Sequence, residues 1–339
     1  MSTHDDVQPL APIAGESVPP REAEAIEIIK GVIAKQVRED KAKSGLAHRD
    51  AHAKAHCCVK AEFRVVDGLP PELRAGIFAQ ARAYDAWIRF SNGNGTPQPD
   101  GARDGRGMAV KLMGVAESPS TTQDFIMINF PVFVVRNAID YIDLQTRGIW
   151  GFFFPRPFKI RLHEMIVTAR MFLQTVTNPL NLRYYSMVPY RFGGDLACKF
   201  SARPTGTPSP FTATSGDNFL RANMIAHLAK SSATFDFMVQ LRRDPAKMPV
   251  EDPTILWDED ASPFVTVARI TIPVQSFDTP EHTLFCENLS FTPWHCVDAH
   301  RPLGGINRVR RVVYEYISKL RHDLNQAPRK EPAGFDIGG

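Results

Sequence analysis

The sequence lacks the features that mark a secreted, membrane-spanning or nucleic-acid-binding protein. Its five cysteines are an odd number without regular spacing, which argues against a disulfide framework and favours reduced thiols. Its 40 basic and 37 acidic side chains form no basic tract, so nucleic acid is a poor partner. The longest apolar runs, such as 125–135, fall far short of the roughly 20 residues that span a bilayer. We therefore expect a soluble, cytoplasmic protein.

The two ends of the chain lack the pattern of a folded element. Residues 1–20 are polar and contain prolines, without the charged start and apolar run of a signal peptide, and we expect a disordered leader. Residues 326–339 follow the last predicted helix and are expected to form a flexible tail. No internal repeat and no linker divides residues 21–325, so we expect a single domain there, with a sizeable core from a 43% hydrophobic composition.

Helical periodicity is clearest near the two ends of this domain. Apolar residues recur at helical spacing over residues 22–43, and residues 305–324 give a second strong helix. A shorter helix is expected at 217–230. Residues 137–177 also have helical texture, but the stretch 148–158 is so rich in Gly, Pro and aromatic residues that we expect a loop with an apolar surface.

Short runs with strand character fill the remainder of the domain, separated by clusters of Gly, Pro, Asn and Asp. They lie at 57–66, 86–91, 106–114, 124–129, 196–204, 233–243, 264–273 and 283–291. This texture predicts an antiparallel sheet.

The C-terminal helix carries a tyrosine between two arginines. Arg310, Tyr314 and Arg321 are four and seven residues apart, which places all three side chains on one helix face. A guanidinium one turn away favours the phenolate form of a tyrosine, and a phenolate is one of the axial ligands that proteins offer to haem iron. Arg and Tyr at this spacing usually form an ordinary surface pair, so the pattern is weak by itself.

A second candidate group surrounds the first predicted strand. His52 could act as a general base on a peroxide and then protonate the departing oxygen. Ser91, on the neighbouring predicted strand, could accept a hydrogen bond from the imidazole, and Arg89 points to the same face. A histidine at a sheet edge and a buried serine are the plainer alternative. The histidines and cysteines of residues 48–58 could offer zinc ligands, but their spacing is irregular and no second ligand pair matches them.

Six motifs, taken in order, resemble those of haem catalases. They are RxxHAK at Arg49–Lys54, RFS at Arg89–Ser91, RDGRGMAVK at Arg103–Lys111, the region Asn129–Phe133, ENLSFTPW at Glu287–Trp294, and RxxxY at Arg310–Tyr314 followed by Arg321. The chain is most similar to the short catalase-related proteins, the catalase-like peroxidases. The resemblance implies an α+β fold: a closed antiparallel barrel of about eight strands with surrounding helices. It also implies a homo-oligomer.

The resemblance also implies a role for each matched residue. Tyr314 would be the proximal iron ligand, with Arg310 stabilising its anion. His52 would be the distal acid and base, oriented by Ser91, with Asn129 as a hydrogen-bond donor. The other haem contacts would come from arginines that pair with the propionates and from aromatic residues on the porphyrin: Arg49, Arg89, Arg321, Phe133 and Tyr141. The sequence has no CxxCH, so we expect haem b without covalent attachment.

In function, the resemblance implies a peroxide-reducing oxidoreductase with a role in the response to oxidative stress. We expect a haem peroxidase with weak catalase activity, acting on hydrogen peroxide or organic hydroperoxides through a ferryl intermediate, with an unidentified electron donor. A fatty-acid hydroperoxide isomerase or lyase and a non-enzymatic haem-binding protein are the alternatives. Ala51 replaces a usually bulkier valine and implies a roomier pocket. We expect the aromatic run Trp150–Phe154 to pack or to line a channel rather than to anchor a membrane. The stretch 149–158 could offer apolar lining to an organic molecule.

Overall fold

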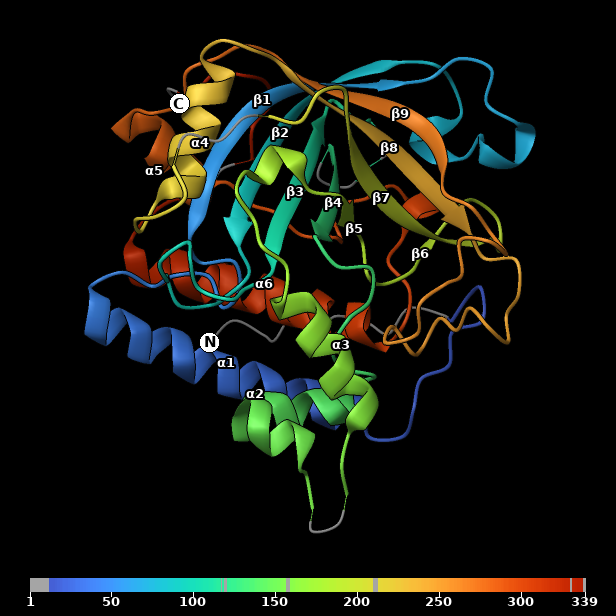
Figure 1. Cartoon of the computed structure of the whole chain (residues 1–339). Helices are drawn as coiled ribbons and strands as arrows, with labels where there is room; N and C mark the ends of the chain where they lie inside the picture. Colours follow the sequence, from blue (N-terminus) through green and yellow to red (C-terminus); the bar gives the residue numbers. More distant parts are fainter. Residues whose placement is uncertain are drawn as a thin grey trace.

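The computed structural model describes residues 12–116, 118, 121–156, 159–209, 213–329 and 331–337 (Figure 1). The strands within them form one antiparallel sheet: β1 (Ala55–Val65), β2 (Ala83–Asn92), β3 (Arg106–Met113), β4 (Thr122–Ile128), β5 (Tyr184–Tyr185), β6 (Tyr190–Arg191), β7 (Ala197–Thr205), β8 (Ala233–Leu241) and β9 (Val265–Ile272). The order is β5-β4-β3-β2-β1-β9-β8-β7, and a β5–β7 pairing closes the ring. The closed antiparallel barrel of eight strands is therefore confirmed within the described part of the chain, with β6 added beside β7.

The interior of the barrel is filled by aromatic side chains. Phe125 lies 4.7 Å from Phe237 between ring centroids, and Phe63 lies 5.0 Å from Phe237. Because successive residues of a strand point to opposite faces, each of these rings fixes which residues of its strand face outward. The packed core therefore fixes how the strands align, and this alignment decides which residues point outward and which lie at the strand ends.

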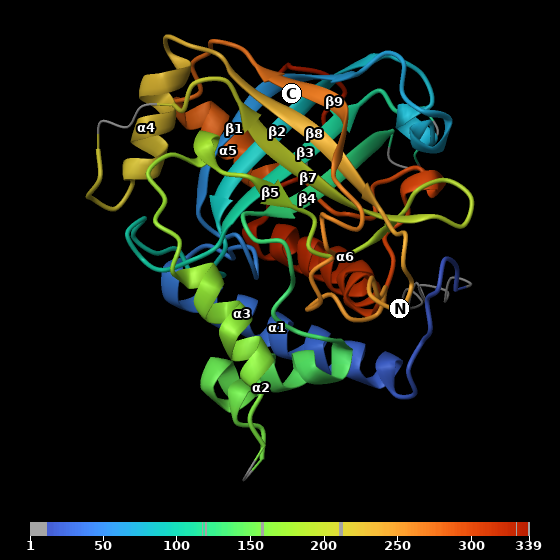
Figure 2. The same cartoon turned by 45° about the vertical axis from the view of Figure 1, so that its right-hand side comes forward.

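Helices cover the outside of the barrel: α1 (Glu22–Ser44), α2 (Ala138–Phe153), α3 (Leu162–Phe172), α4 (Phe219–Leu228), α5 (Pro280–Asn288) and α6 (Gly305–Asn325). The helices predicted near residues 22–43, 217–230 and 305–324 are confirmed. The apolar stripe of α1 packs on that of α6 through Ile29, Ile33, Val309, Val313 and Ile317. In Figures 1 and 2, α6 lies between the barrel and the layer that contains α1 and α2.

The strand predicted at 283–291 is wrong, because most of it belongs to α5. The Thr279 side chain accepts a hydrogen bond from the His282 N–H, and Pro280 occupies the first turn, so the helix starts just before the apolar run that looked like a strand. The remaining barrel strand is instead the two-residue β5, which is too short to show an alternating pattern.

The loop predicted over 148–158 is also wrong in part. Gly148 interrupts α2 with a φ of 66°, but the helix resumes and continues to Phe153. The phenyl rings of Phe152 and Phe153 are buried, and the guanidinium of Arg161 stacks on Phe152 at 4.6 Å from its centroid. Tertiary packing therefore stabilises a helix that local composition disfavours. Residues 157 and 158 lie outside the described part of the chain.

The two chain ends contact the domain where the structure describes them. Glu16 of the expected leader accepts a hydrogen bond from the Gly304 N–H and pairs with Arg308 at 3.0 Å. Phe335 of the expected tail packs edge-on against Trp87, with 5.7 Å between ring centroids. Residues 1–11, 330, 338 and 339 lie outside the described part, and the division at 20 and 325 stays a prediction. No helix among the described residues has the length and apolar character needed to cross a bilayer.

Candidate functional site

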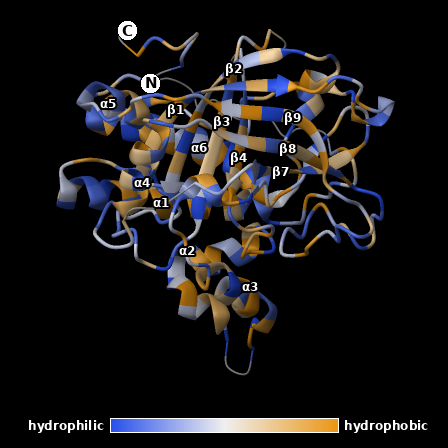
Figure 3. Cartoon of the chain, turned by 45° about the horizontal axis from the view of Figure 1, so that its top comes forward, coloured by the Kyte–Doolittle hydropathy of each residue, from blue (hydrophilic) through white to orange (hydrophobic). Residues whose placement is uncertain are grey.

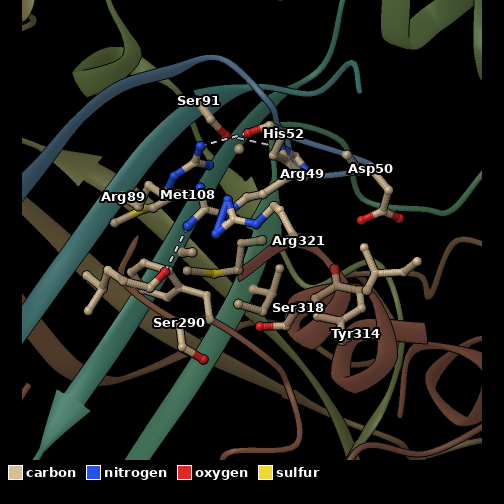
Figure 4. A pocket seen from close by; sticks show the side chains of 18 of the residues that line it. Arg49, Asp50, His52, Arg89, Ser91, Met108, Ser290, Tyr314, Ser318 and Arg321 are labelled. Atoms are coloured by element: carbon tan, nitrogen blue, oxygen red, sulfur yellow. Dashed lines mark hydrogen bonds between the residues drawn. The ribbon is translucent and has the colours of Figure 1, made fainter. Parts of the chain in front are cut away.

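A cavity lies between the barrel and α6 and holds about 770 Å³ of empty space, part of it open to solvent. Six predicted site residues line it: Arg49, His52, Arg89, Ser91, Tyr314 and Arg321. Figure 4 shows their side chains gathered around the cavity, with Tyr314 on α6 and His52 on the side of the strands.

His52 is held by the backbone around it. Its φ of 58° is unusual for a residue with a side chain, and its N–H donates to the Gly93 carbonyl at 3.0 Å. The ring Nδ1 lies 3.0 Å from the Asn92 carbonyl oxygen and 3.1 Å from Ser91 Oγ. Because a carbonyl can only accept, Nδ1 carries the proton and Nε2 is left with a free lone pair.

Gly107 leaves the space that the His52 ring occupies. A Cβ at this position on β3 would lie 2.5 Å from His52 Nδ1 and 2.8 Å from Ser91 Oγ. Both distances are shorter than real Cβ contacts. The close approach of ring and strand therefore requires glycine, a requirement that the sequence reasoning missed although Gly107 lies in the quoted RDGRGMAVK motif.

Burial keeps the His52 imidazole neutral. Loss of solvation lowers the pKa of His52 to about 4, and the charge of Arg89 adds to the shift. Arg89 also donates to the His52 carbonyl at 2.7 Å. At pH 7 the ring is therefore a base with an empty acceptor nitrogen, as general base catalysis requires.

Three arginines lie at the edge of the cavity, and two of them share one carboxylate. Arg49 Nη1 lies 3.1 Å from Glu287 Oε2, and Arg321 Nη1 lies 2.5 Å from Glu287 Oε1. Burial lowers the pKa of Arg321 to about 10, with Arg49 contributing, and this value still leaves it protonated at neutral pH. Arg89 Nε is buried without a hydrogen-bond partner among the described residues. These arginines outnumber the one carboxylate that pairs with them, which suits a ligand with carboxylate groups.

The α6 wall carries Tyr314 and its arginine. Arg310 Nη2 donates to Tyr314 Oη at 3.1 Å, and Arg310 Nη1 donates to Asn307 Oδ1 at 3.2 Å. Burial works to lower the pKa of Arg310, but the hydroxyls of Tyr314 and Tyr190 outweigh it and the pKa is raised. The charged guanidinium therefore lies one helical turn from Tyr314 and donates directly to its oxygen.

Asn129 is not brought to the cavity wall. Its side-chain Oδ1 accepts from the Arg106 N–H at 2.6 Å, and its Nδ2 donates to Gln174 Oε1 at 2.6 Å. Its backbone N–H also donates to the Arg106 carbonyl at 2.9 Å. The amide is thus used to close the end of the β3–β4 pair, and the distal donor role predicted for it has no support in this geometry.

The aromatic residues expected on the porphyrin do not line the cavity either. Phe133 and Tyr141 pack edge-on against each other with ring centroids 6.1 Å apart. Burial, and next the Asp50 carboxylate, raise the pKa of the Tyr141 hydroxyl. None of the described residues of the stretch 149–158 lines the cavity, so the channel lining expected of it is not found there; Phe158 lies outside the described residues.

Two further acidic residues were given no role from the sequence. Glu287 lies in the quoted ENLSFTPW motif, and only the fold shows that it pairs with arginines from two distant segments, Arg49 and Arg321. Asp50 lines the cavity, and burial raises the pKa of its carboxyl. Asp50 stands two residues before His52, and this closeness in the sequence could have indicated that it lies near the site. Among the described residues, no group of three or more His, Cys, Asp or Glu side chains could hold a metal ion, which leaves the zinc alternative without support.

Comparison with known proteins agrees with this geometry. The family model described as catalase matches residues 28–147. Similar solved structures include a fungal catalase (17% identity, TM-score 0.67, covering 88% of this chain and 64% of that one) and catalase A from Saccharomyces cerevisiae (16%, 0.67, 96% and 72%). The chain therefore spans less than two thirds of the fungal catalase. No curated protein sequence matches. The catalase model thus matches less than half of the chain, and the solved structures show that the chain shares the fold of catalases.

Proposed function

We propose that this protein is a haem-dependent peroxidase with weak catalase activity, which reduces hydrogen peroxide or organic hydroperoxides. The observation that carries the proposal is one cavity with a neutral, oriented His52 on one wall and an arginine-paired Tyr314 on another. A homo-oligomer and a cytoplasmic location stay predictions.

The residues around the cavity fit haem b. The Tyr314 oxygen would hold the iron, and Arg310 would stabilise the phenolate. Arg49, Arg89 and Arg321 would pair with the two propionates, which fits the excess of arginines over the Glu287 carboxylate and the unpartnered Arg89 Nε. When bound, haem supplies the redox centre that takes two oxidising equivalents from a peroxide.

His52 would move the proton in this reaction. Its Nε2 is free to accept the proton of an incoming hydroperoxide O–H group and to return it to the oxygen that departs. The Asn92 carbonyl and Ser91 Oγ hold the ring through Nδ1, so the ring need not reorient between the two transfers. General acid and base catalysis of this kind contributes roughly a hundred- to ten-thousand-fold in rate.

A second candidate function is isomerisation or cleavage of a fatty-acid hydroperoxide at the same site. The lining is largely apolar away from the arginines, with Ala51, Met108, Ile126, Leu289 and Phe291, and this favours an organic substrate over hydrogen peroxide. A non-enzymatic haem-binding protein would have no need of the neutral His52 or its two hydrogen-bond partners.

Steady-state assays of the haem-loaded protein on hydrogen peroxide and on a fatty-acid hydroperoxide, each with and without an organic electron donor, separate these functions. A peroxidase oxidises the donor with little oxygen evolution. An isomerase or lyase consumes the fatty-acid hydroperoxide without any donor. Rapid oxygen evolution with no turnover of any organic compound would overturn the proposal, as would haem binding without any reaction with peroxides.

A further inference from the structure

The helical hairpin made by α2 and α3 exposes several large apolar side chains. Trp150 is 71% exposed, Leu162 62% and Leu173 68%. We define the hairpin patch as these three residues with Phe154, Ile160 and Ile166, all of them exposed. The hairpin projects from the rest of the molecule in Figures 1 and 2, and Figure 3 shows hydrophobic colouring on both helices. Exposed apolar side chains gathered in this way mark an interaction site.

The patch rests on a well-packed base. Phe152 and Phe153 are buried, and Arg161 donates to the Phe152 carbonyl at 2.8 Å. The same guanidinium pairs with Asp140 at 2.6 Å and with Asp143 at 2.8 Å. The exposed rings are therefore presented by an ordered hairpin, and their exposure does not come from an unfolded segment.

Basic side chains surround the apolar ones and leave the hairpin positive. Arg147, Arg156, Lys159 and Arg170 are all exposed. Residues 144–194 contain a single acidic residue, Glu164, which is buried and paired with Arg136. Asp140 and Asp143 are engaged by Arg161. Arg156, Lys159 and Arg170 have no carboxylate partner within the described ranges.

We infer that the hairpin patch docks on the surface of an anionic lipid bilayer. Trp and Phe rings settle at the boundary between headgroups and acyl chains, while Arg and Lys extend their charges to lipid phosphates. A second copy of this chain is a poorer occupant, since a symmetric contact would face two positively charged hairpins toward each other. Because no described helix can cross a bilayer, the contact is peripheral. The inference does not depend on the proposed function.

Flotation of the purified protein with lipid vesicles tests the inference. The protein is expected to bind vesicles of phosphatidylcholine mixed with phosphatidylglycerol, to bind pure phosphatidylcholine far less, and to be released by raised salt. The double variant Trp150→Glu/Ile166→Glu should lose binding. Arg156→Gln/Lys159→Gln should weaken it by about tenfold or more. Leu284→Glu and Lys247→Gln, at exposed positions elsewhere, are the matched controls and should leave binding unchanged.

Trp150 also supplies a local optical signal. Trp87 and Trp257 are buried, and Trp294 is partly buried and held by a hydrogen bond to the Asn307 carbonyl. A blue shift of emission on anionic vesicles should therefore come mainly from Trp150 and should disappear in Trp150→Phe. Absence of vesicle binding, or equal binding by the patch variants and the controls, would overturn the inference. If sedimentation shows that the patch variants turn a dimer into a monomer without any effect of vesicles, the hairpin is an interface between copies instead.

Discussion

The two walls of the cavity are built in different ways. On the α6 wall, Arg310, Tyr314 and Arg321 lie on one face of one helix, and the Arg310–Tyr314 contact is made within a single turn. On the barrel wall, three separate segments of the chain meet, and they contribute His52, Ser91 and Gly107. The first wall depends on helix geometry alone, whereas the second depends on the register of β1, β2 and β3.

This difference separates two tasks. The α6 wall presents charge and an oxygen ligand on a rigid helix, and a small shift of the helix would move its residues together. On the barrel wall, Gly107 of β3 leaves room for the neutral His52 imidazole, and the Asn92 carbonyl orients it. Changes on the α6 wall should therefore act on binding of the cofactor, and changes on the barrel wall should act on the rate of reaction.

The largest expected effect is on the α6 wall. Tyr314→Phe removes the oxygen proposed to hold the iron, and we expect the variant to lose most of its haem or the spectrum of a tyrosinate complex. Optical and electron paramagnetic spectra of the reconstituted protein measure this. Tyr316→Phe, at an exposed tyrosine on the same helix, is the control and should leave both unchanged. An unaltered spectrum in Tyr314→Phe would mean that another residue binds the iron.

On the barrel wall, His52→Ala should retain haem and react with peroxide roughly a hundred to ten thousand times more slowly, because the proton carrier is lost. Ser91→Ala should be milder, since the Asn92 carbonyl still orients the ring. Stopped-flow mixing with peroxide gives these rates. His163→Ala, at an exposed histidine of α3, serves as control. Equal rates for His52→Ala and the parent would remove the proposed proton transfer.

Gly107→Ala tests whether the strand sets the position of His52. The added methyl group would lie 2.5 Å from Nδ1 and must displace the ring. We expect the rate with peroxide to fall by up to about a hundredfold, with haem content near that of the parent. Gly101→Ala, where a Cβ meets nothing within 4 Å, is the matched control. A Gly107→Ala protein with the parent rate would show that the ring position is not critical.

The same contrast explains what could be predicted from the sequence. Helical periodicity alone predicted α1, α4 and α6 and the shared face of Arg310, Tyr314 and Arg321, since these depend on neighbours within a turn or two. The six motifs in order then predicted the catalase fold and the residues that line the cavity around His52. Helical periodicity thus predicted the shared face on the α6 wall, and the family resemblance predicted the residues of the barrel wall.

What escaped prediction depends on contacts between distant segments. Asn129 is in the expected stretch, but its amide is used by the Arg106 backbone and Gln174. The run at 283–291 has strand composition, yet the Thr279 cap makes it helical. Gly107 and Glu287 gain their roles only when β3 and the end of α5 meet the segment that contains Arg49 and His52. The pattern of a single sequence does not show which distant segments come into contact in the fold.

Burial of neutral imidazoles should make the barrel sensitive to acid. Burial lowers the pKa of His56 and of His300 to about 4, as it does for His52, against about 6.5 when unfolded. The unfolded chain thus binds more protons between pH 6.5 and 4, so stability is full above this window and is lost as pH falls through it. Each histidine contributes at most about 1.4 kcal/mol per pH unit. Denaturant unfolding across this range measures the slope, which should decrease in His56→Gln.

The smallest expected effect concerns access to His52. Ala51 lines the cavity beside it, and Ala51→Val adds two methyl groups without touching Nδ1 or its partners. A hydrogen peroxide molecule is small enough to pass this change, whereas a fatty-acid hydroperoxide must lay its chain along the lining. We expect several-fold slower turnover of the organic hydroperoxide and an unchanged rate with hydrogen peroxide, since one or two methyl groups in an apolar pocket discriminate by about 1–3 kcal/mol. Ala51→Gly, which removes bulk at the same position, should not slow the larger substrate. If Ala51→Val slows both peroxides equally, the added volume has disturbed His52 itself, and the cavity does not select its substrate at this position.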